Sequence, residues 1–283
     1  MEATPGTVSQ ILWHFTGGRP RTATSEKQSA KRKSAANAYE ALVSILESRT
    51  LRLGTEKEAV NVRVAKLRVY DKKEKAYRID HDVMQTLKSA PVCCLADIPI
   101  MHLAYHAERY GQFALGFHRD AARRAGFNPV FYTLHDSDVI RNIHEGFAKA
   151  QATGLEFSRL MINEIETIAR DSELHDEVGD FIDALREDNE DVTAALLMAK
   201  TSIEQFLAFV KTFESDEFYS VYCEREWRSV NTFEFALEDI AMIVLPRRAE
   251  GRDYFQSFVE DRFRTLGLPR TIPVVPWETL VES

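Results

Sequence analysis

The first hundred residues consist of short stretches in which apolar and polar positions alternate, interrupted by one stretch with helical spacing. Residues 10–16 alternate too tightly for a helix and predict a strand that ends at Gly17-Gly18. Between residues 34 and 48 the apolar positions recur at helical spacing, and residues 51–54 predict a strand leading out. Residues 60–70 alternate Val and Leu with charged residues, and together with residues 76–79 they predict a hairpin.

The rest of the chain contains strands and helices on both sides of a long helical stretch. Further strands are predicted at residues 92–96, 112–118, 129–134, 218–222, 224–230, 240–245 and 271–275. Short helices are predicted at residues 101–109 and 252–266, and helical spacing holds throughout residues 137–213. The strands at 112–118 and 129–134 are both assigned to the core sheet, joined by a connector with Arg119, Arg123 and Arg124.

This order of elements predicts an α+β fold. The strands are short and mostly linked by hairpins rather than by regular helical crossovers, which favours a mixed or antiparallel central sheet. We expect residues 1–136 and 215–283 to form this core domain and residues 137–214 to form a large acidic all-helical insertion.

Composition describes an ordinary globular protein, with 45% hydrophobic and 28% charged residues. No apolar run approaches the roughly 20 residues that cross a bilayer, and no targeting segment is visible, so we expect a cytoplasmic protein with no membrane partner. The three cysteines, two of them adjacent, have no spacing typical of disulfides or metal sites.

Charge is distributed unevenly along the chain. The net charge is −8, yet residues 1–80 hold 16 Lys and Arg against 9 Asp and Glu, whereas residues 151–220 hold 5 against 17. An acidic face beside a basic one can steer a charged partner, although charged helix faces are more often simply solvated. The overall acidity makes nucleic acid the less favoured partner.

Two segments contain residues suited to chemistry. Strand alternation places His14 at the end of the first strand, facing opposite to Trp13 and Phe15, where a site residue can stand; the alternative is a hydrogen-bonded histidine at a sheet edge. The same alternation in residues 222–228 predicts one face with Glu224, Glu226 and Arg228. Paired carboxylates suit acid/base or ribose-orienting work, but a structural ladder of ion pairs gives the same pattern.

Metal and phosphate motifs are incomplete in this chain. His102 and His106 have the i, i+4 spacing of zinc proteases, but Leu103 stands where the general-base glutamate should be, and no third ligand is indicated, so we expect no metal site. Neither glycine-rich phosphate-binding motif occurs, which leaves nucleoside triphosphate chemistry of those types unsupported.

Several segments resemble a known family. Residues 94–100, which read Cys-Leu-Ala-Asp-Ile-Pro-Ile, are followed by His102 and His106, by residues 110–117, by Asn128-Pro129-Val130, and by Glu224-Arg225-Glu226-Trp227-Arg228. Together they resemble the AbiGi antitoxin family over most of the chain. The resemblance implies a bacterial protein of abortive phage infection that acts beside a cognate toxin of the AbiGii type or on that toxin's target.

The opening of the chain is more distantly similar to DarT-like ADP-ribosyltransferases. The similarity covers His14-Phe15-Thr16, the helix around residues 41–46 and Leu51-Arg52-Leu53-Gly54. In those enzymes a first-strand histidine contacts the NAD ribose and a late-strand glutamate orients the reaction. The resemblance implies that His14 and either Glu226 or Glu224 match these positions.

Two functions from different classes follow. The first is an antitoxin or regulatory protein of phage defence, for which the sequence indicates no certain cofactor. The alternative is an NAD-dependent ADP-ribosyltransferase-like enzyme. Its candidate catalytic residues are His14, Glu224, Glu226 and Arg228, and its candidate cofactor-binding residues are His14, Thr16 and Tyr110.

Overall fold

The computed structural model describes residues 9–18, 32–54, 57–71, 73–170, 179–217 and 221–281. The chain forms two compact units, the first from residues 1–58, 90–131 and 216–283 and the second from residues 59–89 and 132–215. Strands and helices occur in both, and the predicted mixed α+β fold is confirmed. The division into a core domain and an insertion at residues 137–214 stays a prediction.

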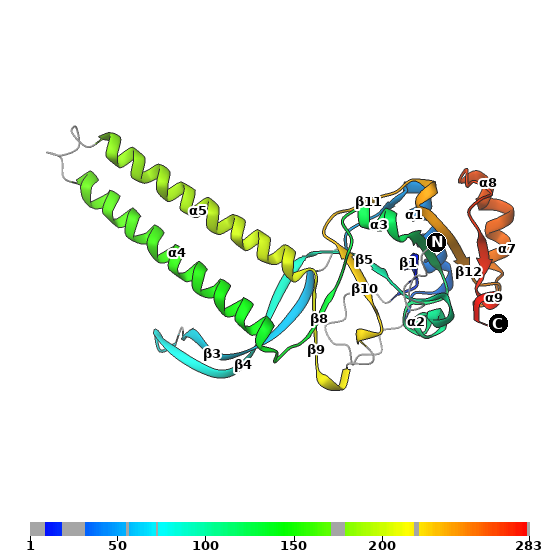
Figure 1. The fold of residues 1–283 in the computed structure, drawn as a ribbon, viewed down its shortest axis with the longest axis horizontal. Coiled ribbons are helices and arrows are strands. Elements are labelled where there is room, and N and C mark those ends of the chain that lie inside the picture. Colours follow the sequence, from blue (N-terminus) through cyan, green and yellow to red (C-terminus); the bar gives the residue numbers. More distant parts are fainter. Residues whose placement is uncertain are drawn as a thin grey trace, which may run out of the picture. The chain divides into compact units, whose positions relative to one another are not determined.

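A seven-stranded sheet is the centre of the first unit (Figure 1). Its order is β13 (Val274–Pro276), β12 (Ile240–Leu245), β6 (Ala114–His118), β1 (Ile11–Phe15), β5 (Cys93–Ala96), β10 (Glu226–Ser229) and β7 (Asn128–Pro129). All neighbouring pairs are antiparallel except β12 and β13, which are parallel. The sheet is therefore mixed, as the strand lengths and hairpins predicted.

Both faces of this sheet are buried, because alternate residues of β1 enter two different hydrophobic clusters. Leu12 packs in the larger cluster, which includes Tyr39 and Leu42 of α1 (Ala35–Ser48). Trp13 packs in the second cluster with Leu103 of α2 (Leu103–Tyr110). Each helix therefore covers a different face of the sheet, as period-two alternation requires.

Smaller elements complete the first unit. They are β2 (Thr50–Leu51), which pairs with β11 (Phe233–Glu234), and η1 (Ile100–His102), α3 (Arg119–Arg124), η2 (Ser215–Glu217), η3 (Leu237–Asp239) and α9 (Trp277–Val281). The helix predicted at residues 252–266 is broken into α7 (Tyr254–Ser257), the π-helical segment η4 (Phe258–Arg262) and α8 (Phe263–Thr265). It ends before Gly267, which has a φ of +65°, a conformation that glycine adopts at no steric cost.

The second unit combines two small sheets with two long helices. Its elements are β3 (Lys57–Asp71) paired with β4 (Ala76–Pro91), β8 (Phe131–Leu134) paired with β9 (Val210–Phe213), α4 (Asp138–Arg170) and α5 (Gly179–Leu207). Val60, Val62 and Val64 of β3 form a buried cluster with Ile140 and Leu207, and Figure 1 shows α4 and α5 running side by side.

Three predicted elements differ from the observed ones. Residues 129–134 do not form one core strand, because β7 lies at the edge of the main sheet while β8 pairs with β9. Residues 210–213 were predicted to be helical, but they form β9. The two buried residues of this strand, Val210 and Phe213, are three positions apart, a spacing that also occurs on one face of a helix. Val221 and Tyr222 are helical rather than extended, and the rest of the strand predicted at residues 218–222 lies outside the described residues.

Candidate functional site

The two segments predicted to carry chemistry lie in one sheet, separated by a single strand. β1 and β10 are the two neighbours of β5, so residues 13–16 and 224–228 are brought close although they are some two hundred positions apart in sequence. His14 is half-buried, and its Nδ1 lies 3.2 Å from the backbone oxygen of Cys94. This contact between His14 and β5 is the kind that a structural histidine makes with a neighbouring strand.

The register of these strands separates the candidate side chains by face. Trp13 is opposite Ala96, and Ala96 is in turn opposite Glu226. Residues paired in this way share a face, and the next residue along the strand points to the other face. His14 therefore lies on the face opposite to that of Glu226 and Arg228.

Arg228 is the most deeply buried charged group of the site. Its side chain is 1% exposed, its Nη2 donates to Glu226 Oε2 at 2.8 Å, and the same nitrogen lies 3.5 Å from Glu58 Oε2. Burial lowers the pKa of the Arg228 guanidinium, but the carboxylates of Glu226 and Glu58 raise it by more, so its pKa lies above the usual value. Both carboxylates thus serve to hold a buried cation.

Glu224 lies just before β10 and contacts residues of α2. Arg225 has a φ of +42°, and β10 begins only at Glu226. The buried carboxylate of Glu224 accepts from Arg109 Nη1 at 2.7 Å and from the Tyr110 hydroxyl at 3.1 Å. The structure therefore brings together Glu224 and Tyr110, two of the predicted site residues.

Tyr110 and Thr16 are tied into the packing of the first unit. The Tyr110 ring stacks on His106, with ring centroids 4.5 Å apart, and Phe15 packs against both rings. The buried Thr16 hydroxyl donates to the backbone oxygen of Ala38 at 2.7 Å, which satisfies this hydroxyl. Both contacts are ones that a purely structural residue makes.

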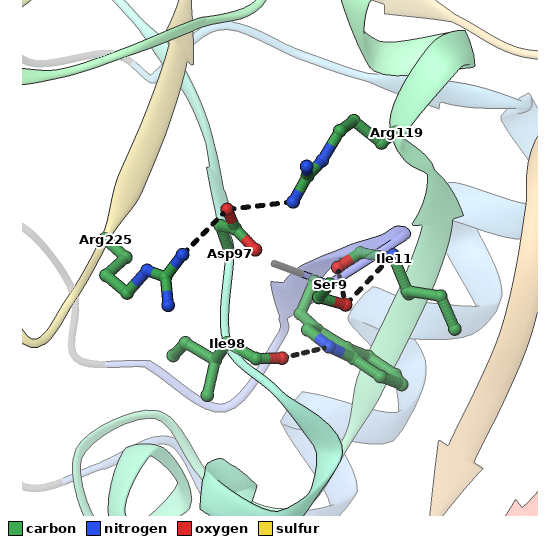
Figure 2. Close-up of polar contacts among 7 residues, drawn as sticks. Ser9, Ile11, Asp97, Ile98, Arg119 and Arg225 are labelled. Carbon is green, nitrogen blue, oxygen red and sulfur yellow. Dashed lines mark hydrogen bonds and ion pairs between the residues drawn. The ribbon is translucent and has the colours of Figure 1, made fainter. Parts of the chain in front are cut away.

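A third polar cluster centres on Asp97, which belongs to the 94–100 segment but was not among the predicted site residues. Figure 2 shows its carboxylate between Arg119 and Arg225, with Oδ2 accepting at 2.9 and 3.3 Å. Asp97 is 6% exposed, and its Oδ1 has no hydrogen-bond partner among the described residues. The guanidinium of Arg119 also stacks over Trp227, 5.5 Å from the ring centroid.

Asp97 holds the start of β10 against the end of β5. Its backbone N–H donates to the carbonyl of Arg225, while its side chain binds the guanidinium of the same residue. A signal for this role was present in the sequence, because an acidic residue directly after an apolar strand needs a cationic partner if it is buried. The partners themselves were not predictable from spacing, since they lie 22 and 128 residues away.

Other kinds of site find little support in the residues that the structure describes. Within those ranges, no group of three or more His, Cys, Asp and Glu is placed to hold a metal ion. His102 is exposed while His106 is buried, so the two imidazoles do not present a common ligand face. A hollow of about 290 Å³ in the first unit is lined by residues such as Gln10, His118 and Arg119 and by none of the predicted site residues. Among the described helices, none is both long and apolar enough to span a bilayer.

Comparison with known proteins gives one match. The model of a family described as "Putative abortive phage resistance protein AbiGi, antitoxin" matches residues 65–256, about two thirds of the 283 residues. The matched range contains Tyr110, Glu224, Glu226 and Arg228, whereas His14 lies before it. No curated protein and no solved structure matches the chain.

Proposed function

Since this chain belongs to the AbiGi family of abortive phage resistance, we propose that it is an antitoxin that restrains a cognate toxin of the AbiGii type, by contact or at the toxin's target. The observation that carries the proposal, beside the family, is the state of the polar cluster. Glu224 is bound by Arg109 and Tyr110, and Glu226 is bound by Arg228. Buried carboxylates with hydrogen-bond partners of this kind are common structural features, and an antitoxin requires a binding surface rather than a reactive group.

The proposal is tested by phage plating. Cells that carry this gene together with its neighbouring toxin gene should reduce plaque formation, and cells with the toxin gene alone should grow poorly. The proposal is wrong if the two genes together change neither phage plating nor growth. The control strain carries the same two genes with a premature stop codon in this gene.

An NAD-dependent ADP-ribosyltransferase is the competing hypothesis. The contact of Tyr110 with Glu224 favours it, because two of the predicted cofactor and catalytic residues then share one location. The register that puts His14 and Glu226 on opposite faces of the sheet disfavours it, since a shared small ligand needs both groups within hydrogen-bonding reach. Incubation with labelled NAD, comparing Glu226→Gln with the parent, separates the two: label transfer that the variant loses would establish the enzyme.

A further inference from the structure

The carboxylate of Asp97 is shared by two arginines through one of its oxygens. Asp97 follows β5, Arg119 begins α3 and Arg225 precedes β10, all within the first unit. Figure 2 shows the two guanidinium groups reaching Asp97 from different sides. Oδ2 accepts from Arg119 Nη2 at 2.9 Å and from Arg225 Nη2 at 3.3 Å. Because a carboxylate carries a single negative charge, Asp97 compensates only one of these two cations.

The contact between Arg119 and Asp97 is one half of a two-pronged ion pair. Guanidinium groups often bind a carboxylate through two parallel N–H···O bonds, and Nε–H and Nη2–H lie on one edge of the group, where they form such a fork. Here Nη2 binds Oδ2, whereas Arg119 Nε and Asp97 Oδ1 are buried and have no hydrogen-bond partner among the described residues. The two atoms left over are therefore the donor and the acceptor that complete the fork.

Arg225 is the partner of Asp97 that can be exchanged. Its contact is the longer of the two, and 36% of its side chain is exposed, against 18% for Arg119. Arg119 is also fixed by its stacking over the Trp227 ring. When Arg225 leaves Oδ2, the Asp97 carboxylate can turn so that both of its oxygens face Arg119. That arrangement satisfies two buried polar atoms, which offsets part of the free energy lost with the Arg225 contact.

We propose that Arg225 binds an oxyanion, the phosphate or carboxylate group of a small ligand, and that Asp97 and Arg119 then close into a two-pronged pair. The oxyanion replaces Asp97 as an acceptor for the Arg225 guanidinium, whose planar fork fits two oxygens of either group. The adjacent carboxylate of Glu224 is paired with Arg109, which reduces its repulsion of an anion. The backbone bond from Asp97 N–H to the Arg225 carbonyl involves neither side chain and stays in place. This ligand site is independent of the proposed antitoxin function.

The experiment follows the arginine Nε–H signals of the full chain by NMR during titration with inorganic phosphate at constant ionic strength. The Arg225 and Arg119 signals, each identified by its loss when that residue is replaced by Lys, should shift along one saturation curve. Arg225→Met keeps the length of the side chain and removes its donors, so it should abolish binding and show the saturated Arg119 signal before phosphate is added. Arg225→Lys keeps the charge but loses the fork, and should raise Kd about tenfold. Arg124→Gln, in an exposed ion pair of the same unit, is the matched control and should leave Kd unchanged.

A parallel titration with acetate separates the two sources of the oxyanion. Saturation by phosphate alone assigns the site to phosphorylated ligands, and saturation by acetate extends it to carboxylates. Equal shifts with sodium chloride overturn the proposal, because charge screening then moves the signals. So does an Arg119 signal that neither phosphate nor Arg225→Met changes, since Asp97 and Arg119 then form no fork. If Arg225→Met does not fold by circular dichroism, Arg225→Lys decides, and an unchanged Kd in that variant overturns the site.

Discussion

Arg228 offers the sharpest test of how the polar cluster is held. The guanidinium is almost fully buried, 2.8 Å from Glu226 and 3.5 Å from Glu58. Arg228→Met fills similar volume but leaves those carboxylates without their cation. Removing one partner of a buried ion pair costs about 3–5 kcal/mol, because the remaining charge is desolvated and uncompensated. At about 2–4 °C per kcal/mol, that corresponds to a fall in Tm of roughly 6–20 °C.

A double-mutant cycle isolates the interaction. Glu226→Gln alone leaves Arg228 with Glu58 and an amide, and it should cost about 1–3 kcal/mol. The double variant should be more stable than the sum of the two losses predicts, by about 1–3 kcal/mol, since it removes both charges together.

Tryptophan fluorescence during urea unfolding is the suitable assay. Trp13, Trp227 and Trp277 all belong to the first unit, and the chain has three tryptophans, so the signal reports unfolding of that unit. The reasoning is refuted if Arg228→Met costs less than about 1 kcal/mol, or if the losses are strictly additive, because either result means that Glu226 does not compensate the buried guanidinium.

Three further predictions follow from single positions. Gly116→Ala should lower the free energy of unfolding by about 1–3 kcal/mol in the same urea assay, because the added methyl would lie 2.9 Å from Trp13 Cζ3 in the centre of the sheet; an unchanged midpoint would contradict it. Asp97→Asn should cost about 3 kcal/mol, since two guanidinium groups lose their buried carboxylate, whereas Arg124→Gln in an exposed ion pair should change stability by less than about 0.5 kcal/mol. Burial lowers the pKa of His144, so the unfolded state takes up its proton first and stability should fall as pH drops below about 6.5; helix melting followed at 222 nm should show this fall, and His144→Gln should reduce it.

The sequence predicted those parts of the fold that depend on local periodicity. The alternation in residues 10–16 corresponds to β1, and the helical spacing in residues 34–48 corresponds to α1. In each case, burial of one face of the element imposes the period of its apolar residues. The strand β9 was missed because Val210 and Phe213, both buried, have a spacing that fits a helix as well as a strand. Its pairing with β8 is a long-range contact that no local pattern reports.

The sequence named candidate residues, but it did not predict their arrangement. The resemblance to DarT-like ADP-ribosyltransferases placed His14 together with Glu226, and β1 and β10 do flank β5. The face of the sheet to which each of the two side chains points depends on the strand register. A shift of one residue in the register moves every side chain of the strand to the other face. The positive φ of Arg225, directly before β10, is a backbone state that no residue type at that position signals.

Growth of cells that express a candidate cognate toxin of the AbiGii type tests the proposed antitoxin function most directly. Co-expression of this chain should restore growth, and the Tyr110→Phe variant should restore it equally, because it keeps the packed ring and removes only the hydroxyl that binds Glu224. Failure of the wild-type chain to restore growth would contradict the antitoxin account. Restoration by the wild type but not by an equally stable Tyr110→Phe variant would show that the polar cluster acts chemically, which the account denies.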